Sequence, residues 1–171
     1  MASIFIAENM ASTKVGSLLR SGISAVDVEN GDIQVLGDLA PNMGNDLYTT
    51  GAVTAITDAI YLVDGVELEY TEELTRGIDD YVNVANKPFR LRKPMVGDRF
   101  SISEEAITAL AANGEVVVGN CVETPAAGTN LAEVAPANVN AASSFVATIV
   151  ARWTFGTRAI PMVRLEVTKA L

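Results

Sequence analysis

The side chains in this sequence that could take part in catalysis are mainly carboxylates, because the chain contains no histidine and a single cysteine. Histidine is the commonest general base and the commonest protein ligand for zinc, copper and non-haem iron. Its absence excludes Ser-His-Asp and Cys-His machinery. Neither GxxxxGK nor GxGxxG occurs, so nucleotide-dependent chemistry has no visible site. Cys121 lies in an apolar run and is expected to be a small buried residue, not a nucleophile.

Glu67 and Glu69 form the best candidate pair of catalytic carboxylates. Two residues apart on one face of a strand, they would stand about 7 Å apart, near the separations used by glycosidases. The only tryptophan, Trp153, is far away in sequence, and no aromatic cluster surrounds the pair to hold a sugar. We therefore favour a solvated strand face and keep a carboxylate-dependent glycosidase as the weaker alternative.

The remaining acidic pairs are adjacent in sequence and do not match the Asp-x-Asp-x-Asp-Gly calcium loop. They are Glu72-Glu73, Asp79-Asp80 and Glu104-Glu105. We interpret them as surface charge, so the sequence predicts no cofactor and no assembled metal site. A weak divalent-cation site between subunits stays open.

One basic cluster runs from Lys87 to Lys93. As a strand it would bury Phe89 and Leu91 and project Arg90 and Arg92 from the other face. The net charge of −9 repels a phosphate backbone, so we do not expect free nucleic acid to be a partner. We expect these arginines to face carboxylates, either in the acidic N-terminal half or on a neighbouring molecule.

The N-terminal stretch 1–22 is predicted to be an extended arm, because small and polar residues separate its apolar ones. Apolar residues on an arm need a surface to lie on, either the chain's own core, which we favour, or a partner. Together, the arm and the basic cluster give the candidate residues of a protein interface: Ile4, Phe5, Ile6, Arg90, Arg92 and Lys93.

Alternating apolar residues and turn dipeptides predict a mainly β protein, an antiparallel β-barrel or β-sandwich. One hairpin is expected around Asn30-Gly31, with Val28 opposite Ile33, and a second around Asp64-Gly65. Proline residues on either side of 89–92 predict an edge strand or a crossing point there. One short helix is expected at about 103–113, followed by a strand over 115–122. The clearest strand signal is a C-terminal hairpin over 145–167.

Composition places these elements in one domain. The chain has 171 residues, 49% of them hydrophobic and 19% charged, which suits a generous core. We expect the arm at 1–22 to precede a single β domain at 23–171. No apolar run reaches the length of a membrane span, and the first residues lack the positive region of a signal peptide. We therefore expect the product to remain where it is made, in the cytoplasm.

Three features together resemble the small decoration, or cement, proteins of bacteriophage heads. They are the Met1-Ala2-Ser3 start with its apolar arm, the Val96 to Phe100 element, and the closing hairpin. The resemblance implies a non-enzymatic virion protein with a barrel or tulip-like fold. Such proteins often assemble as trimers on the outer surface of the capsid and bridge subunits of the major capsid protein.

Two other classes stay open beside decoration. One is a different virion part, such as a minor head or tail protein. The other is a carbohydrate-binding module, which should show an aromatic platform, whereas only 6% of the residues are aromatic.

Overall fold

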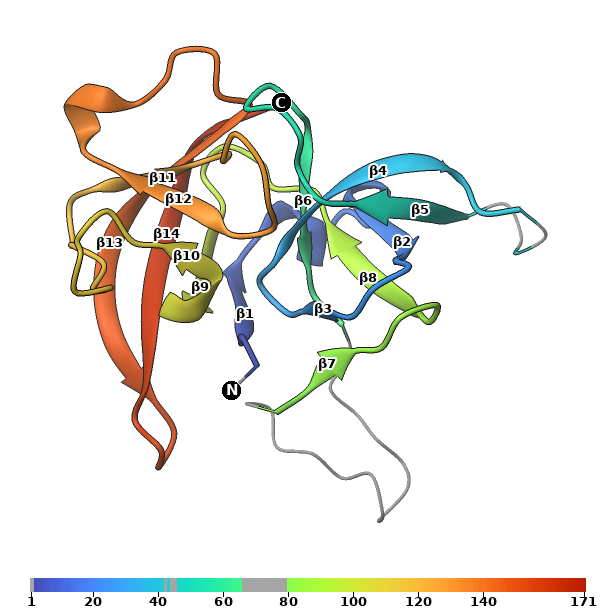
Figure 1. The fold of residues 1–171 in the computed structure, drawn as a ribbon, viewed down its shortest axis with the longest axis horizontal. Helices are drawn as coiled ribbons and strands as arrows, with labels where there is room; N and C mark the ends of the chain where they lie inside the picture. Colours follow the sequence, from blue (N-terminus) through green and yellow to red (C-terminus); the bar gives the residue numbers. More distant parts are fainter. Residues whose placement is uncertain (1, 42, 44–45, 66–79) are drawn as a thin grey trace.

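The computed structural model describes residues 2–41, 43, 46–65 and 80–171, and in them the chain is mainly β (Figure 1). One sheet has seven strands in the order β1-β9-β14-β13-β11-β12-β10. Their bounds are β1 Phe5–Asn9, β9 Arg99–Ser103, β10 Ile107–Thr108, β11 Cys121–Glu123, β12 Leu131–Val134, β13 Phe145–Phe155 and β14 Ile160–Ala170. The expected mainly β architecture is confirmed.

Five further strands close a small barrel in the order β2-β5-β4-β6-β8. They are β2 Leu19–Ile23, β4 Ile33–Leu39, β5 Leu47–Gly51, β6 Ile60–Val63 and β8 Pro88–Arg92, and β3 Val28–Glu29 pairs with β7 Val82–Asn83 beside them. Most pairs are antiparallel, but β2 with β5 and β10 with β12 are parallel. Short 3-10 turns occupy η1 Ala11–Thr13, η2 Gly16–Leu18, η4 Glu104–Ala106 and η5 Pro136–Asn138.

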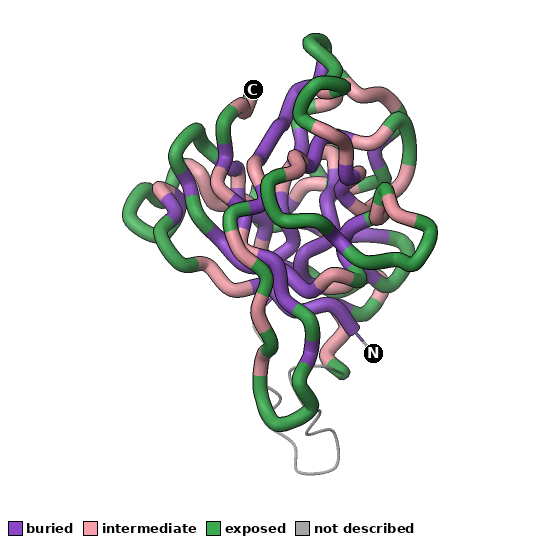
Figure 2. The backbone as a smooth tube through the Cα atoms, turned by 90° about the vertical axis from the view of Figure 1, so that its left-hand side faces the viewer, coloured by how far each residue is buried: buried purple, intermediate pink, exposed green. Residues whose placement is uncertain are grey.

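The largest hydrophobic core lies where the barrel meets the seven-stranded sheet, and the buried parts of the tube in Figure 2 meet in the middle of the molecule. The barrel contributes Ile33 and Leu62, and the sheet contributes Phe100 and Leu165, all of them fully buried. The Phe100 ring packs against Phe5 with centroids 5.5 Å apart. The two sheets are thus joined by one continuous core.

The predicted C-terminal hairpin is confirmed. Strands β13 and β14 pair along their whole length, and Gly156 makes the turn with φ +66. Val163, Leu165 and Val167 are buried as expected, because alternate side chains of β14 face the core. Strand β13 is central, paired with β14 on one side and β11 on the other.

The hairpin predicted around Asn30-Gly31 was wrong in its pairing. The turn exists, with Gly31 at φ +92, but Val28 pairs with Asn83 and Ile33 pairs with Leu62. The reason is that Asn30 is buried and its Oδ1 accepts hydrogen bonds from Gly65 N and Asn83 Nδ2. These long-range bonds hold β3 and β4 apart, so that β3 pairs with β7 and β4 pairs with β6.

The helix predicted at about 103–113 was also wrong. Its first residues form only the 3-10 turn η4, and Ile107 begins strand β10, which pairs in parallel with β12. Ser103 makes no side-chain cap, since its Oγ accepts a hydrogen bond from Ile4 N of the N-terminal segment. Tertiary pairing therefore overrides the local helix signals.

Three further expectations have mixed outcomes. Strand β8 is not at an edge, because it pairs with both β2 and β6, and Pro88 is tolerated as its first residue. The strand expected over 115–122 is confined to its end, in β11, and Cys121 is only partly buried. The partner strand of the hairpin expected around Asp64-Gly65 lies outside the described residues, as do Glu67 and Glu69.

Candidate interaction surface

The buried carboxylates of the described chain have structural partners. Glu133 is the clearest case: its oxygens accept hydrogen bonds from Leu110 N at 2.8 Å, Val117 N at 2.9 Å and Asn120 Nδ2 at 2.8 Å. Burial raises the pKa of Glu133, but these three bonds outweigh burial and hold the pKa below its usual range. Glu133 therefore organises the 107–120 segment as an ionised hydrogen-bond acceptor.

The predicted arginine–carboxylate pairing is found within the chain. Asp64 directly follows β6. Its Oδ2 forms an ion pair with Arg90 Nη2 at 2.7 Å and a second ion pair with Arg92 Nε. Arg92 is buried and reaches Ser12 Oγ as well. Arg92 is thus a structural residue, whereas the Arg90 side chain stays 38% exposed. The backbone N–H of Lys93 donates to Leu18 O.

The apolar residues of the predicted arm lie on the chain's own core, as the favoured interpretation had it. Ile4 is 0% exposed and Phe5 is 5% exposed, and Phe5 belongs to strand β1. In this conformation neither side chain offers contact to a partner. Ile6 points to the opposite face of β1 from Phe5 and is only partly buried.

Ile6 belongs to the face of the seven-stranded sheet that points away from the barrel, which we call the outer face. It is built by β1, β9, β14 and β13, whose registers place side chains in cross-strand rows. The row nearest the turn of the hairpin holds Ile160 and Phe155, and the next holds Met162 and Trp153. The row after these holds Ile6, Ser101 and Arg164.

The end of the outer face nearest the hairpin turn is apolar. Ile4, Ile160 and Met162 form a separate buried cluster, against which Ile6, Trp153 and Phe155 pack while remaining partly exposed. The Trp153 and Phe155 rings meet edge to face, with centroids 6.0 Å apart and an interplanar angle of 81°. Partly exposed aromatic side chains beside a packed cluster are typical anchors of protein interfaces.

The other end of the outer face is charged and fixed by bonds between strands. Arg164 Nε lies 2.7 Å from Glu8 Oε2, and Ser101 Oγ donates to Glu8 Oε1 at 2.6 Å. Arg99 Nη2 lies 2.8 Å from Glu166 Oε2. The outer face therefore joins an aromatic patch to a rim of paired charges on four hydrogen-bonded strands.

Sequence reasoning missed Trp153 and Phe155 as surface residues. The cause is an irregularity between Ile149 and Ala151 that leaves Val150 as an extra residue in β13. Before it, odd-numbered residues such as Ile149 face the core, and after it Trp153 and Phe155 face outward. A strand that is apolar on both parities gives no sign of this shift.

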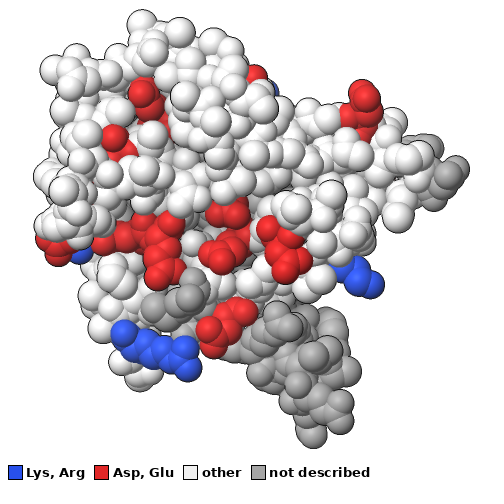
Figure 3. Space-filling view, in the orientation of Figure 1, with Lys and Arg blue, Asp and Glu red and all other residues white. Residues whose placement is uncertain are grey.

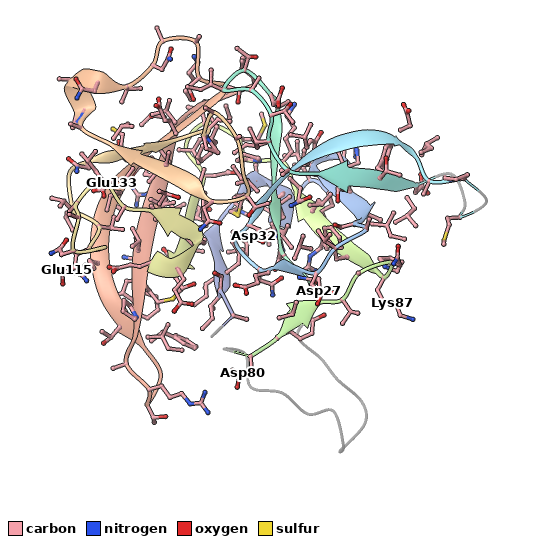
Figure 4. All side chains as sticks on the ribbon, viewed as in Figure 1. Asp27, Asp32, Asp80, Lys87, Glu115 and Glu133 are labelled. Carbon is pink, nitrogen blue, oxygen red and sulfur yellow. The ribbon has the colours of Figure 1, made fainter. Side chains whose placement is uncertain are left out.

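A second feature of the surface is acidic. In Figure 3 the carboxylates on the viewed face gather in a band across its middle. Figure 4 labels Asp27, Asp32 and Asp80 near the middle of this view and Glu115 at its left-hand side. Arg158 and Asp80 lie 3.6 Å apart, and Arg152 contacts both Glu104 and Glu115. The band is thus partly neutralised at its margins.

Within the described ranges, no group of three or more His, Cys, Asp or Glu side chains could hold a metal ion. Among the same residues, no helix is long and apolar enough to cross a membrane. No family model, curated protein or solved structure matches this chain.

Proposed function

We propose that this protein is a non-enzymatic virion protein that binds the outer surface of a bacteriophage capsid and stabilises the shell by bridging subunits of the major capsid protein. We further propose that it acts as a homotrimer, is made in the host cytoplasm and resides on the capsid. The resemblance of its start, its 96–100 element and its closing hairpin to decoration proteins suggests this class.

The observation that supports the proposal best is the outer face itself. Trp153 and Phe155 supply apolar contact area on two well-supported strand positions, and Arg99 and Arg164 supply charge-assisted hydrogen bonds around them. Because the face is built from hydrogen-bonded strands, little conformational entropy is lost when it docks. An adhesive protein needs such a surface, and it needs no reacting group.

Shell stabilisation follows from multivalency. A trimer that touches several capsid subunits gains avidity well above that of each contact, because the second and third contacts form intramolecularly. Binding to the assembled shell and not to free subunits shifts the equilibrium toward the shell. The protein would therefore raise the temperature at which heads open without making or breaking a bond.

A carbohydrate-binding role is less well supported by the same aromatic pair. A sugar ring stacks on a flat aromatic face, and two rings at an interplanar angle of 81° do not form one continuous platform.

The test is to mix purified protein with preformed heads that lack it and to measure bound copies and the temperature of head opening. Binding should saturate at a fixed stoichiometry and raise the opening temperature. Trp153→Ala with Phe155→Ala should bind about tenfold or more weakly, whereas Leu110→Ala, at an exposed apolar residue elsewhere, should bind normally. Heads that never take up the unmodified protein would refute the proposal.

The trimer is tested separately by size-exclusion chromatography with light scattering, which should give three times the 18.0 kDa of one chain. A stable monomer at the concentrations that saturate heads would refute the trimer.

A further inference from the structure

A cavity of about 800 Å³ lies against the barrel, away from the rows of the outer face. Strands β2 and β8 and the start of β5 line it, and Tyr81 and Asn83 from the β7 segment complete the described lining. Its size falls in the range of ordinary ligand sites. Its walls combine aromatic side chains, namely Tyr48, Tyr81 and Phe89, with two guanidinium groups.

Arg20 is the distinctive residue of this cavity. Of the arginines that the structure describes, it alone has no carboxylate within ion-pair distance. Its Nη1 donates to Ser17 O at 2.7 Å and to Leu19 O at 2.9 Å, which fixes the guanidinium against the backbone. The edge formed by Nε and Nη2 makes no hydrogen bond to any described residue. That edge is the one that binds a carboxylate through two parallel hydrogen bonds.

The second guanidinium in the cavity is already engaged. Arg90 donates through Nε to Asp64 Oδ2 and through Nη2 to the same carboxylate, so this edge of the guanidinium is occupied, although Asp64 also contacts Arg92. Asp46 is exposed and lines the same cavity. A polyanion would be repelled by Asp46, whereas a single carboxylate on a peptide could pair with Arg20 while Asp46 accepts a peptide N–H.

We propose that this cavity binds an extended segment of a partner protein through one acidic side chain, whose carboxylate pairs with Arg20 and whose neighbours pack on Tyr48 and Phe89. The inference rests on the proposed function in one respect: the segment belongs to the shell protein that the chain decorates. A nucleic acid is disfavoured as the occupant by the net charge of −9.

The test uses the peptide acetyl-Ala-Phe-Glu-Phe-Ala-amide and the same peptide with Gln in place of Glu. Titrated into the ¹⁵N-labelled protein, the Glu peptide should shift the backbone amide signals of residues 19–21 and 48 in a saturable manner. The Gln peptide should bind about tenfold or more weakly, because an interaction with a charged partner is lost. This comparison uses the unmodified protein, so it does not depend on how a variant folds.

Variants then assign the carboxylate to its partner. Arg20→Gln should weaken binding of the Glu peptide about tenfold or more and leave the Gln peptide unchanged. Arg20→Lys keeps the charge without the planar fork and should fall between the two. Arg152→Gln is the matched control, since it removes an exposed arginine outside the cavity and should bind the peptide normally.

Equal binding of the two peptides, full affinity in Arg20→Gln, or shifts centred on 153–155 would overturn the inference. Inorganic phosphate that displaces the peptide at equal concentration would overturn the assignment to a peptide carboxylate. Heads that bind the unmodified protein while the peptide does not would refute the cavity alone. A peptide that binds while heads do not would refute the proposed function alone.

Discussion

Asp32 allows a sharp test of how the fold treats buried charge. It follows the Asn30-Gly31 turn, and only 9% of the residue is exposed. Burial raises its pKa from 3.8 to about 6; the hydrogen bond from Glu29 N opposes the rise, and the nearby Glu29 carboxylate adds to it. The folded state therefore holds a proton on Asp32 more tightly than the unfolded chain does.

The sign of the effect on stability follows directly. Below pH 3.8 Asp32 is protonated in both states and folding carries no charge penalty. As pH rises toward 6, the unfolded chain releases the proton first, and stability is lost. The difference between the two pKa values corresponds to about 3 kcal/mol of folding free energy. About 2.5 kcal/mol of this stability should be lost between pH 4 and pH 7.5.

Asp32→Asn mimics the protonated form, and its amide oxygen can still accept the hydrogen bond from Glu29 N. Urea unfolding of both proteins at pH 4 and pH 7.5 isolates this group, because other titrations cancel in the difference. The free energy of unfolding of the variant, relative to that of the parent, should be about 2.5 kcal/mol higher at pH 7.5 than at pH 4. A stability difference that is the same at both would refute a raised pKa.

The matched control is Asp58→Asn, for which the opposite sign is expected. Hydrogen bonds from Thr54 N and Ala55 N lower the pKa of Asp58, so its contribution is present above its unfolded pKa and is lost as pH falls. This variant should be less stable than the parent at both pH 7.5 and pH 4, and the deficit should shrink only as the pH falls below 3.8.

Three further changes test the described packing. Glu133→Gln should lower the free energy of unfolding by about 1–3 kcal/mol at pH 7, because its amide nitrogen cannot accept the backbone N–H groups that the carboxylate accepts; urea unfolding measures this. Asp64→Asn should cost about 3–5 kcal/mol, since it leaves the buried Arg92 without its counter-charge, and raised salt should not restore it. Gly65→Ala should lower the melting temperature clearly, because its Cβ would stand 1.9 Å from Asn83 Oδ1, and a normal melt would contradict that contact.

The sequence predicted local features well where a pattern of neighbouring residues alone determines the structure. The hairpin of β13 and β14 follows from alternation and a glycine turn, and the burial of Phe89 and Leu91 follows from period-two spacing. Prediction failed where a distant group decided the outcome. Asn30 separates two strands through bonds to residues more than 30 positions away, which no local pattern encodes.

The candidate residues of an interface show the same limit. Arg90 and Arg92 were expected to meet carboxylates, and both meet Asp64, but nothing in the sequence distinguishes a partner within the chain from one on a neighbour. Arg20 stood out in no motif. Its significance appears only once the structure shows which arginines are already paired.

The Val150 irregularity connects the fold to the proposed adhesion. If Val150 took a regular place in the pairing with β14, side chains would alternate through it without a shift, and Trp153 and Phe155 would face the same side as Ile149. That side is filled at Ile149 by the main core, and further along it Arg152 binds Glu104 and Glu115. The shift therefore does two things at once: it directs Arg152 to the acidic band, where its charge is paired, and it brings the aromatic pair to the outer face. The aromatic patch that we propose as a binding surface thus depends on a one-residue shift in strand pairing, not on any special composition of the strand.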